Sequence, residues 1–197
     1  MDRGHNATIV VATRGGRGHW KIPSEELERI RTGEMEAAAE VLGVDVVFLD
    51  HKDADVPAGD ALMEELVDVV RRLKPDIVIT FHPMVWRDDH RRVGLAAADA
   101  CFKACLPLVE TEYPAHRPVP TLYFIGRPMV PVEPDVYIDI TAYMEVKIEA
   151  LKRHESQWVK WEIDKDVSTR PLEEVVEGVR HRARQLGRES GARYAEA

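Results

Sequence analysis

The sequence predicts an α/β fold with a mostly parallel sheet that has helices on both faces. Short apolar runs rich in β-branched residues alternate with longer segments of helical periodicity. These runs are apolar at consecutive positions, as in strands that are buried on both faces of a parallel sheet. Charged and imidazole side chains follow the ends of the first three runs. Open α/β sheets bind their ligands at that edge.

The first half of the chain alternates between the two kinds of segment. Ala7–Thr13 is predicted to be a strand that ends in a glycine-rich loop from Arg14 to Gly18. The helix Ser24–Leu42 follows, with Ser24 expected as its N-cap and Gly43 as its stop. The remaining elements of this half are the strand Val44–Leu49, the helix Asp60–Leu73, the strand Ile77–Phe81 and the helix Asp89–Leu106.

The second half contains shorter strands. We expect strands at Val119–Gly126 and Val136–Ile140, a helix at Thr141–His154 and a final helix at Leu172–Leu186, with Gly187 in the stop position. The prolines between Pro114 and Pro134 favour loops at the rim of the sheet over a domain boundary. With 197 residues and no internal repeat, the chain is expected to form a single domain over residues 1–197.

The composition argues against several classes of protein. The formal net charge is −8 and no long basic stretch is present, which disfavours nucleic acid as a partner. No apolar run approaches the roughly 20 residues that span a membrane, and no secretory signal opens the chain. Cys101 and Cys105, four residues apart in a helical segment, fit two small core residues better than a metal pair or a disulfide. We therefore expect a cytoplasmic protein that acts on a small molecule.

The densest group of chemically reactive side chains is Arg87-Asp88-Asp89-His90. A histidine beside a carboxylate is typical of a metal ligand whose tautomer and basicity are set by its neighbour. A compatible alternative is that Asp88 or Asp89 caps the following helix. The glycine-rich loop matches neither G-x-G-x-x-G nor a P-loop, which disfavours a nucleotide-binding domain and favours a flexible rim near a substrate. Arg31 and Glu34 fit either an exposed ion pair or residues that face the site.

Several short motifs follow one another in a fixed order. They are Val10–Gly18, Arg31–Ala39 with Leu42-Gly-Val44, Phe48-Leu-Asp50 with Asp53, Lys74–Thr80, Asp89-His-Arg91 with Val93, Asp139-Ile-Thr141, Lys147, His154-Glu-Ser-Gln157 and Tyr194–Ala197. Each motif is weak alone. In this order, over nearly the whole chain, they resemble the LmbE/PIG-L family of zinc-dependent N-deacetylases.

The resemblance implies a Rossmann-like sheet and one bound zinc ion. It also implies hydrolysis of the N-acetyl group of an N-acetylglucosamine-type sugar conjugate. By the match of motifs, His90 is a zinc ligand and Asp89 is its acidic catalytic partner. Arg31 and Asp53 match positions that face the sugar. Arg87 stands where the family often has a histidine that assists the oxyanion. An arginine can stabilise an oxyanion but does not act as an acid near neutral pH.

One departure from the family pattern concerns the metal. The family's opening H-P-D-D motif supplies two zinc ligands and the general base, and it does not occur in this sequence. Met1–His5 matches the pattern just after the family's first helix, so a strand and most of a helix, roughly 25–30 residues, are expected to be missing. The local candidates to replace the lost ligands are His19, His51, His82 and Asp88.

This departure leaves two hypotheses. The chain is either a zinc deacetylase shortened at its N-terminus, or a catalytically inactive, metal-free homologue that binds a sugar conjugate. Loss of a strand would leave an unpaired sheet edge, and such edges favour association. A homo-oligomer is therefore expected.

Overall fold

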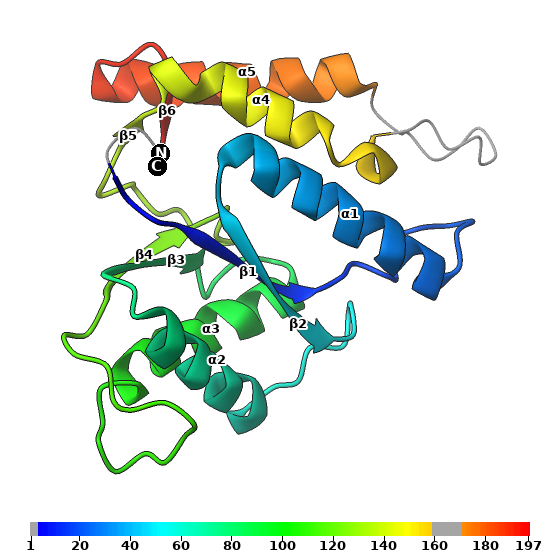
Figure 1. Cartoon of the computed structure of the whole chain (residues 1–197). Helices are drawn as coiled ribbons and strands as arrows, with labels where there is room; N and C mark the ends of the chain where they lie inside the picture. The colour runs from blue at the N-terminus through cyan, green and yellow to red at the C-terminus, as the bar shows by residue number, and fades with distance from the viewer. Residues whose placement is uncertain (1–3, 159–170) are drawn as a thin grey trace. The chain divides into compact units, whose positions relative to one another are not determined.

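The structure is a computed structural model that describes residues 4–158 and 171–197, and it confirms the α/β class (Figure 1). Residues 1–3 of the Met1–His5 match lie outside the described residues. In chain order the elements are β1 (Thr8–Thr13), α1 (Ser24–Leu42), β2 (Asp45–His51), α2 (Asp60–Leu73), β3 (Ile77–Phe81), α3 (Asp88–Lys103), β4 (Thr121–Ile125), β5 (Ile138–Asp139), η1 (Thr141–Tyr143), α4 (Met144–Lys152), η2 (Glu155–Gln157), α5 (Leu172–Ser190) and β6 (Ala195–Glu196).

The chain divides into two compact units. Unit 1 consists of the described parts of Met1–Asp50 and Pro134–Ala197, and unit 2 consists of His51–Glu133. The expected single domain over residues 1–197 stays a prediction. No helix among residues 4–158 and 171–197 has the length and apolar character that crossing a membrane requires.

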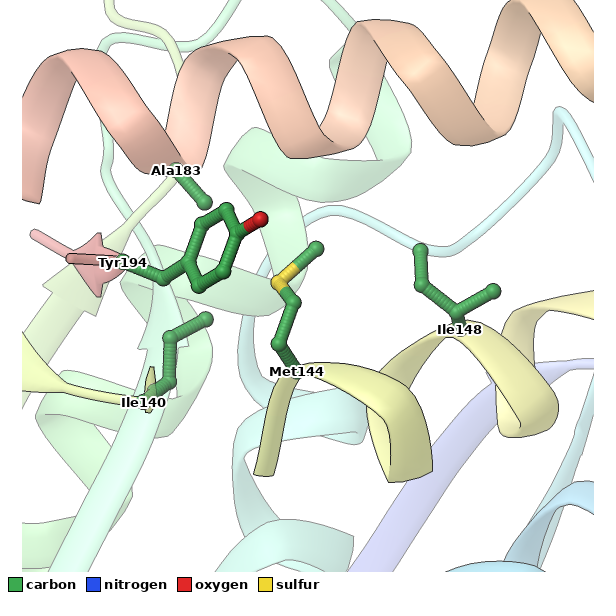
Figure 2. Packing of buried hydrophobic residues seen from close by; sticks show 5 residues of the cluster. All are labelled: Ile140, Met144, Ile148, Ala183 and Tyr194. Carbon is green, nitrogen blue, oxygen red and sulfur yellow. The ribbon is translucent and has the colours of Figure 1, made fainter. Parts of the chain in front are cut away.

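Unit 1 contains the strand pairs β1–β2 and β5–β6 together with α1, α4 and α5. Its apolar core lies between α4 and α5, where Figure 2 shows Met144 and Tyr194 side by side. The other members of this core are Ile140, Ile148 and Ala183. Thr141 Oγ1 accepts a hydrogen bond from Tyr194 N at 3.1 Å, and Lys147 pairs with Glu196. The motif residues near the C-terminus therefore join the end of the chain to α4.

Unit 2 is built on β3 and β4, which pair in parallel from Ile77↔Thr121 to Phe81↔Ile125. Helix α3 packs on β3 and on α2. The close approach of α3 to β3 depends on Gly94, because a Cβ atom there would lie 2.2 Å from Phe81 O. No side chain fits at that distance from a backbone oxygen.

One buried arginine organises the loop that follows α3. Arg71, on α2, is only 2% exposed. Its guanidinium donates to the carbonyl oxygens of Ala104, Leu106, Val109 and Tyr113 and to Thr111 Oγ1, at 2.7–3.1 Å. Five acceptors thus share one cation, and the loop 104–113 is fixed to α2.

The two cysteines are buried free thiols at the C-terminal end of α3, as expected for core residues. Cys105 Sγ donates to Cys101 O at 3.4 Å. Burial is the main cause that raises the pKa of the Cys101 thiol to about 11. Both side chains therefore pack as small apolar groups.

The structure differs from the prediction in the sheet. The described residues form three two-stranded sheets, and the pair β5–β6 is antiparallel. The expected burial of β3 on both faces is also wrong, since Ile77 and Ile79 are 55% and 61% exposed. Only one face of β3 is covered by α3 in unit 2.

Local predictions at the helix ends had mixed outcomes. Gly43, at φ 67°, is the left-handed cap of α1, as predicted. Ser24 is not an N-cap, because α1 begins after Pro23 without a side-chain cap. Helix α5 continues past Gly187 to Gly191, where φ is 81°. Gly187 is instead needed for packing, since a Cβ atom there would lie 2.7 Å from Ala192 O.

Candidate functional site

His90 lies in the first turn of α3, where its ring stacks on Phe81 at the end of β3. The ring centroids are 4.0 Å apart and the ring planes meet at 17°. Burial, followed by the charge of Arg87, lowers the pKa of His90, while Asp89 and Asp53 oppose this shift. The imidazole is therefore biased towards its neutral form, which is the form that binds a metal or accepts a proton.

Asp89 holds the loop that carries Asp53. Its carboxylate accepts hydrogen bonds from Ala54 N at 2.7 Å and from Val56 N at 3.2 Å. Ala54 has a φ of 58°, in the left-handed region that non-glycine residues rarely adopt. The expected helix-capping role is not observed, because α3 begins after Arg87 without a side-chain cap.

Two further contacts fix the same loop. Arg92 donates to Val56 O and pairs with Asp88 at 3.5 Å. Before the loop, His51 Nε2 and Glu65 Oε2 are 2.7 Å apart. Unit 2 therefore brings Asp53, Arg87, Asp89 and His90 near one another after the carboxyl end of β3.

Replacing Asp89 with asparagine is expected to loosen this loop. The amide offers one acceptor oxygen but also an N–H₂ group, so either Ala54 N–H or Val56 N–H loses its partner. A lost bond of this kind costs about 1–2 kcal/mol, which corresponds to roughly tenfold faster amide hydrogen exchange at Ala54 and Val56. Asp99→Asn, at an exposed aspartate of the same helix, is the matched control. Equal exchange in the two variants would contradict this role for Asp89.

Arg31, the predicted sugar-facing residue of α1, is the centre of a network in unit 1. Its guanidinium donates to Gly15 O at 2.5 Å and to Gly18 O at 3.3 Å. Arg31 Nε donates to Ser156 Oγ at 3.3 Å. When the Gln157 amide is turned so that its oxygen faces Arg31, this oxygen accepts a hydrogen bond from Arg31 Nη2 at 3.0 Å.

Glu34, one turn further along α1, completes this network. Its carboxylate accepts hydrogen bonds from Ser156 N at 2.5 Å and from Ser156 Oγ at 2.7 Å. Arg31 and Glu34 thus both contact Ser156, in the turn η2. Within the His154–Gln157 motif, Ser156 and Gln157 therefore contact Arg31.

The glycine-rich loop is hydrogen-bonded to α1 through Arg31, and the flexible rim that the sequence favours stays a prediction. At Gly15, φ is 69° and a Cβ atom would lie 2.6 Å from Arg31 Nη1. At Gly16, a Cβ atom would lie 2.3 Å from Glu28 Oε1. The positive φ favours glycine at position 15, and a side chain at either position would require Arg31 or Glu28 to move aside.

The pH dependence of stability should reveal the burial of His154 in unit 1. Burial chiefly lowers its pKa, the charge of Arg31 adds to this, and Glu34 opposes it. Below the unfolded-state pKa of about 6.5, the unfolded chain binds a proton that the folded chain does not. Stability is therefore expected to fall as the pH drops from about 7.5 to about 5.5.

Urea unfolding of the wild type and of His154→Gln at both pH values tests this expectation. The loss of stability on acidification should be smaller in the variant. His19 and His90, whose pKa values are also lowered, stay in both proteins and cancel in the comparison. An equal loss of stability in the wild type and in His154→Gln would show that His154 has the same pKa in the folded and the unfolded protein.

A cavity of about 370 Å³ in unit 1 lies away from these residues. It is lined at the beginning of β1 and β2 and at the end of α1, by His5, Glu40 and Asp45 among others. Of the predicted site residues, Asp53, Arg87, Asp89 and His90 follow the carboxyl ends of β2 and β3, and Arg31 is not among the lining residues. This cavity is therefore not the candidate site.

The described residues do not complete a zinc site. Catalytic zinc takes three protein ligands, but no group of three His, Cys, Asp or Glu side chains that could hold a metal occurs in residues 4–158 and 171–197. The local candidates have other contacts. His19 Nδ1 accepts from Lys21 N and Ile22 N, His82 Nδ1 accepts from Met84 N, His51 pairs with Glu65 and Asp88 pairs with Arg92.

Comparison with known proteins places the chain among enzymes of one family. Over 99% of its length it is 29% identical to a diacetylchitobiose deacetylase from Thermococcus kodakarensis, of which the match covers 72%. A 4-oxalmesaconate hydratase from Pseudomonas putida is 28% identical, over 82% of this chain and 66% of that protein.

A solved structure shows the same fold. The N,N'-diacetylchitobiose deacetylase from Pyrococcus horikoshii, in complex with its inhibitor MPG, superposes with a TM-score of 0.82 at 25% identity. The match covers 100% of this chain and 73% of that one. The PIG-L family model, described as GlcNAc-PI de-N-acetylase, matches residues 1–101, just over half of the 197 residues. The chain therefore belongs to the PIG-L family.

Proposed function

We propose that this protein is an N-deacetylase that hydrolyses the N-acetyl group of a glucosamine-type sugar conjugate, releasing acetate and a free amine. The observation that carries the proposal is the cluster of Asp53, Arg87 and His90 in unit 2 of a PIG-L family member. The similarity to a diacetylchitobiose deacetylase over nearly the whole chain favours this reaction and this class of substrate.

The contacts within unit 2 suggest a different role for each residue. Arg87 carries a guanidinium group, which is suited to stabilise the oxyanion that develops on the amide carbonyl. Asp53, close enough to His90 to influence its pKa, is suited to accept hydrogen bonds from sugar hydroxyls. Asp89 uses its carboxylate on Ala54 N and Val56 N, so we assign it a positioning role in place of proton transfer.

Arg31 has a related role in unit 1. Its contacts with Gly15, Gly18 and Ser156 favour a role in shaping the glycine-rich loop. The sugar-facing role of Arg31 stays a prediction from the sequence, and within unit 1 the orientation of its guanidinium is already set. A preorganised donor of this kind loses little side-chain entropy on binding.

Zinc belongs to the proposal as the metal that the family resemblance implies. His90 is the ligand that we assign from the described residues. Because these residues do not complete a zinc site, zinc content has to be measured independently of activity.

The test combines acetate release with elemental analysis. Purified protein is incubated with N-acetylglucosamine and with N,N'-diacetylchitobiose, and acetate and bound zinc are quantified for the wild type, His90→Ala and His181→Ala. Acetate release that is lost in His90→Ala and kept in His181→Ala is the expected result, and the zinc content measured beside it shows whether a metal accompanies the activity. His181, exposed on α5, is the control histidine.

Two other outcomes have clear meanings. Binding of the sugars without acetate release or zinc would favour the metal-free, sugar-binding homologue. Neither binding nor hydrolysis would overturn the proposed function. The expected homo-oligomer is tested on the same sample by light scattering after gel filtration.

A further inference from the structure

An exposed apolar patch lies beside the candidate site in unit 2. Trp86 is 69% exposed, and Met84 and Met129 are 41% and 59% exposed. Trp86 and Met84 follow the carboxyl end of β3, while Met129 follows that of β4. Large apolar side chains gathered at a rim often mark a binding surface.

The backbone beneath this patch is firmly held. Met129 N donates to Met84 O at 2.8 Å, and Val85 forms a β-bridge with Pro128. Arg91, on α3, donates to Val85 O at 2.9 Å and to Trp86 O at 2.6 Å. Trp86 is therefore exposed from a fixed turn, so binding a ligand would not require the turn to become ordered.

The patch is continuous with the candidate site through Arg87. The guanidinium carbon of Arg87 is 5.4 Å from the centre of the Trp86 ring. The charge of the same Arg87 acts on His90. Arg87 thus lies against Trp86 and acts electrostatically on His90, which links the patch to the proposed reaction centre.

We propose that Trp86, together with Met84 and Met129, binds the pyranose ring next to the N-acetylated sugar. A pyranose ring presents an apolar C–H face that packs on an aromatic ring, and hydroxyls that need charged or polar neighbours. The contact of Arg87 with Trp86 supplies such a neighbour. An alkyl aglycone would be better served by a patch without an adjoining charge.

This inference rests on the proposed function and specifies its substrate as an amino-sugar disaccharide or longer. Chitobiose and glucosamine are suitable probes, since neither carries an acetyl group that the proposed reaction could remove. Their dissociation constants are measured by calorimetry for the wild type, Trp86→Ala and Trp86→Phe. Phe102→Ala is the matched control, because Phe102 is 61% exposed at the opposite end of α3.

The wild type is expected to bind chitobiose more tightly than glucosamine. Trp86→Ala should raise the Kd for chitobiose roughly tenfold and leave that for glucosamine unchanged, since only the second ring contacts the patch. Trp86→Phe should restore most of the affinity, and Phe102→Ala should behave as the wild type. Circular dichroism confirms that each variant is folded.

Three results would overturn the inference while the proposed function stands. The first is an equal affinity for chitobiose in the wild type and Trp86→Ala. The second is an equal loss of affinity for chitobiose and glucosamine in Trp86→Ala. The third, with octyl glucosaminide as an additional probe, is a loss of affinity in Trp86→Ala for that compound alone. The last result would identify an apolar aglycone as the occupant. If the wild type binds no sugar at all, the proposed function and this inference both fail.

Discussion

Gly94→Ala is expected to destabilise unit 2 by about 3 kcal/mol, at the upper end of the range for overpacking. The added Cβ atom would lie 2.2 Å from Phe81 O and 3.1 Å from Phe81 C. These are backbone atoms of β3, so relief requires α3 to move away from the strand. His90 lies one turn earlier on α3 and stacks on Phe81, so the same movement should disturb the candidate site.

Urea unfolding measures the change, and Gly33→Ala provides the comparison. Gly33 is exposed within α1, and a Cβ atom there meets nothing within 4 Å. Alanine at such a position usually stabilises a helix by about 0.5–1 kcal/mol. The two glycine variants should therefore change stability in opposite directions. A Gly94→Ala protein as stable as the wild type would show that α3 and β3 do not approach as closely as described.

Arg71→Met is expected to cost about 3 kcal/mol as well, for a different reason. Methionine fills much of the same volume but donates no hydrogen bond. The acceptors of Arg71 lie along the loop 104–113, and the substitution leaves four carbonyl oxygens and Thr111 Oγ1 without this donor. Some of them can turn to water, so the loss is smaller than the sum of the five bonds.

Arg72→Met is the matched control, because Arg72 is the next residue on α2 and is exposed. Surface substitutions of this kind usually change stability by less than about 0.5 kcal/mol. Proteolysis adds a local readout, since the loop 104–113 should become a cleavage site in Arg71→Met only. If both arginine variants unfold at the same urea concentration, Arg71 does not stabilise the loop as described.

Local patterns determined which elements could be predicted. The bounds of α1, α2 and β3 agree with the sequence-based prediction. Their apolar periodicity is regular, and Gly43 and Pro75 give clear stop signals. The prediction for α5 ended too early because Gly187 is a packing glycine, and its partner Ala192 comes close only after the chain turns back. The sequence alone does not distinguish a glycine that ends a helix from a glycine that is required for close packing.

The candidate site shows the same division between local and long-range information. Arg87, Asp89 and His90 are neighbours in sequence, so their clustering could be predicted. The hydrogen bonds from Ala54 and Val56 to Asp89 could not, since they join segments more than 30 residues apart. Ser156 is 125 residues from Arg31, and no periodicity links the two. Residue types therefore identified the candidates, while their partners depend on tertiary structure.

The two buried cysteines can report on local unfolding within unit 2. Only a thiolate reacts with an alkylating or disulfide reagent, and the Cys101 thiol, with its pKa of about 11, stays protonated in the folded protein. These are the only two cysteines in the sequence, so labelling of any thiol reports on the end of α3. The rate of labelling in native buffer then follows the population of molecules in which α3 has separated from its neighbours. Thiol labelling would thus detect rare openings of this helix, which equilibrium unfolding does not detect because it measures the whole population of molecules.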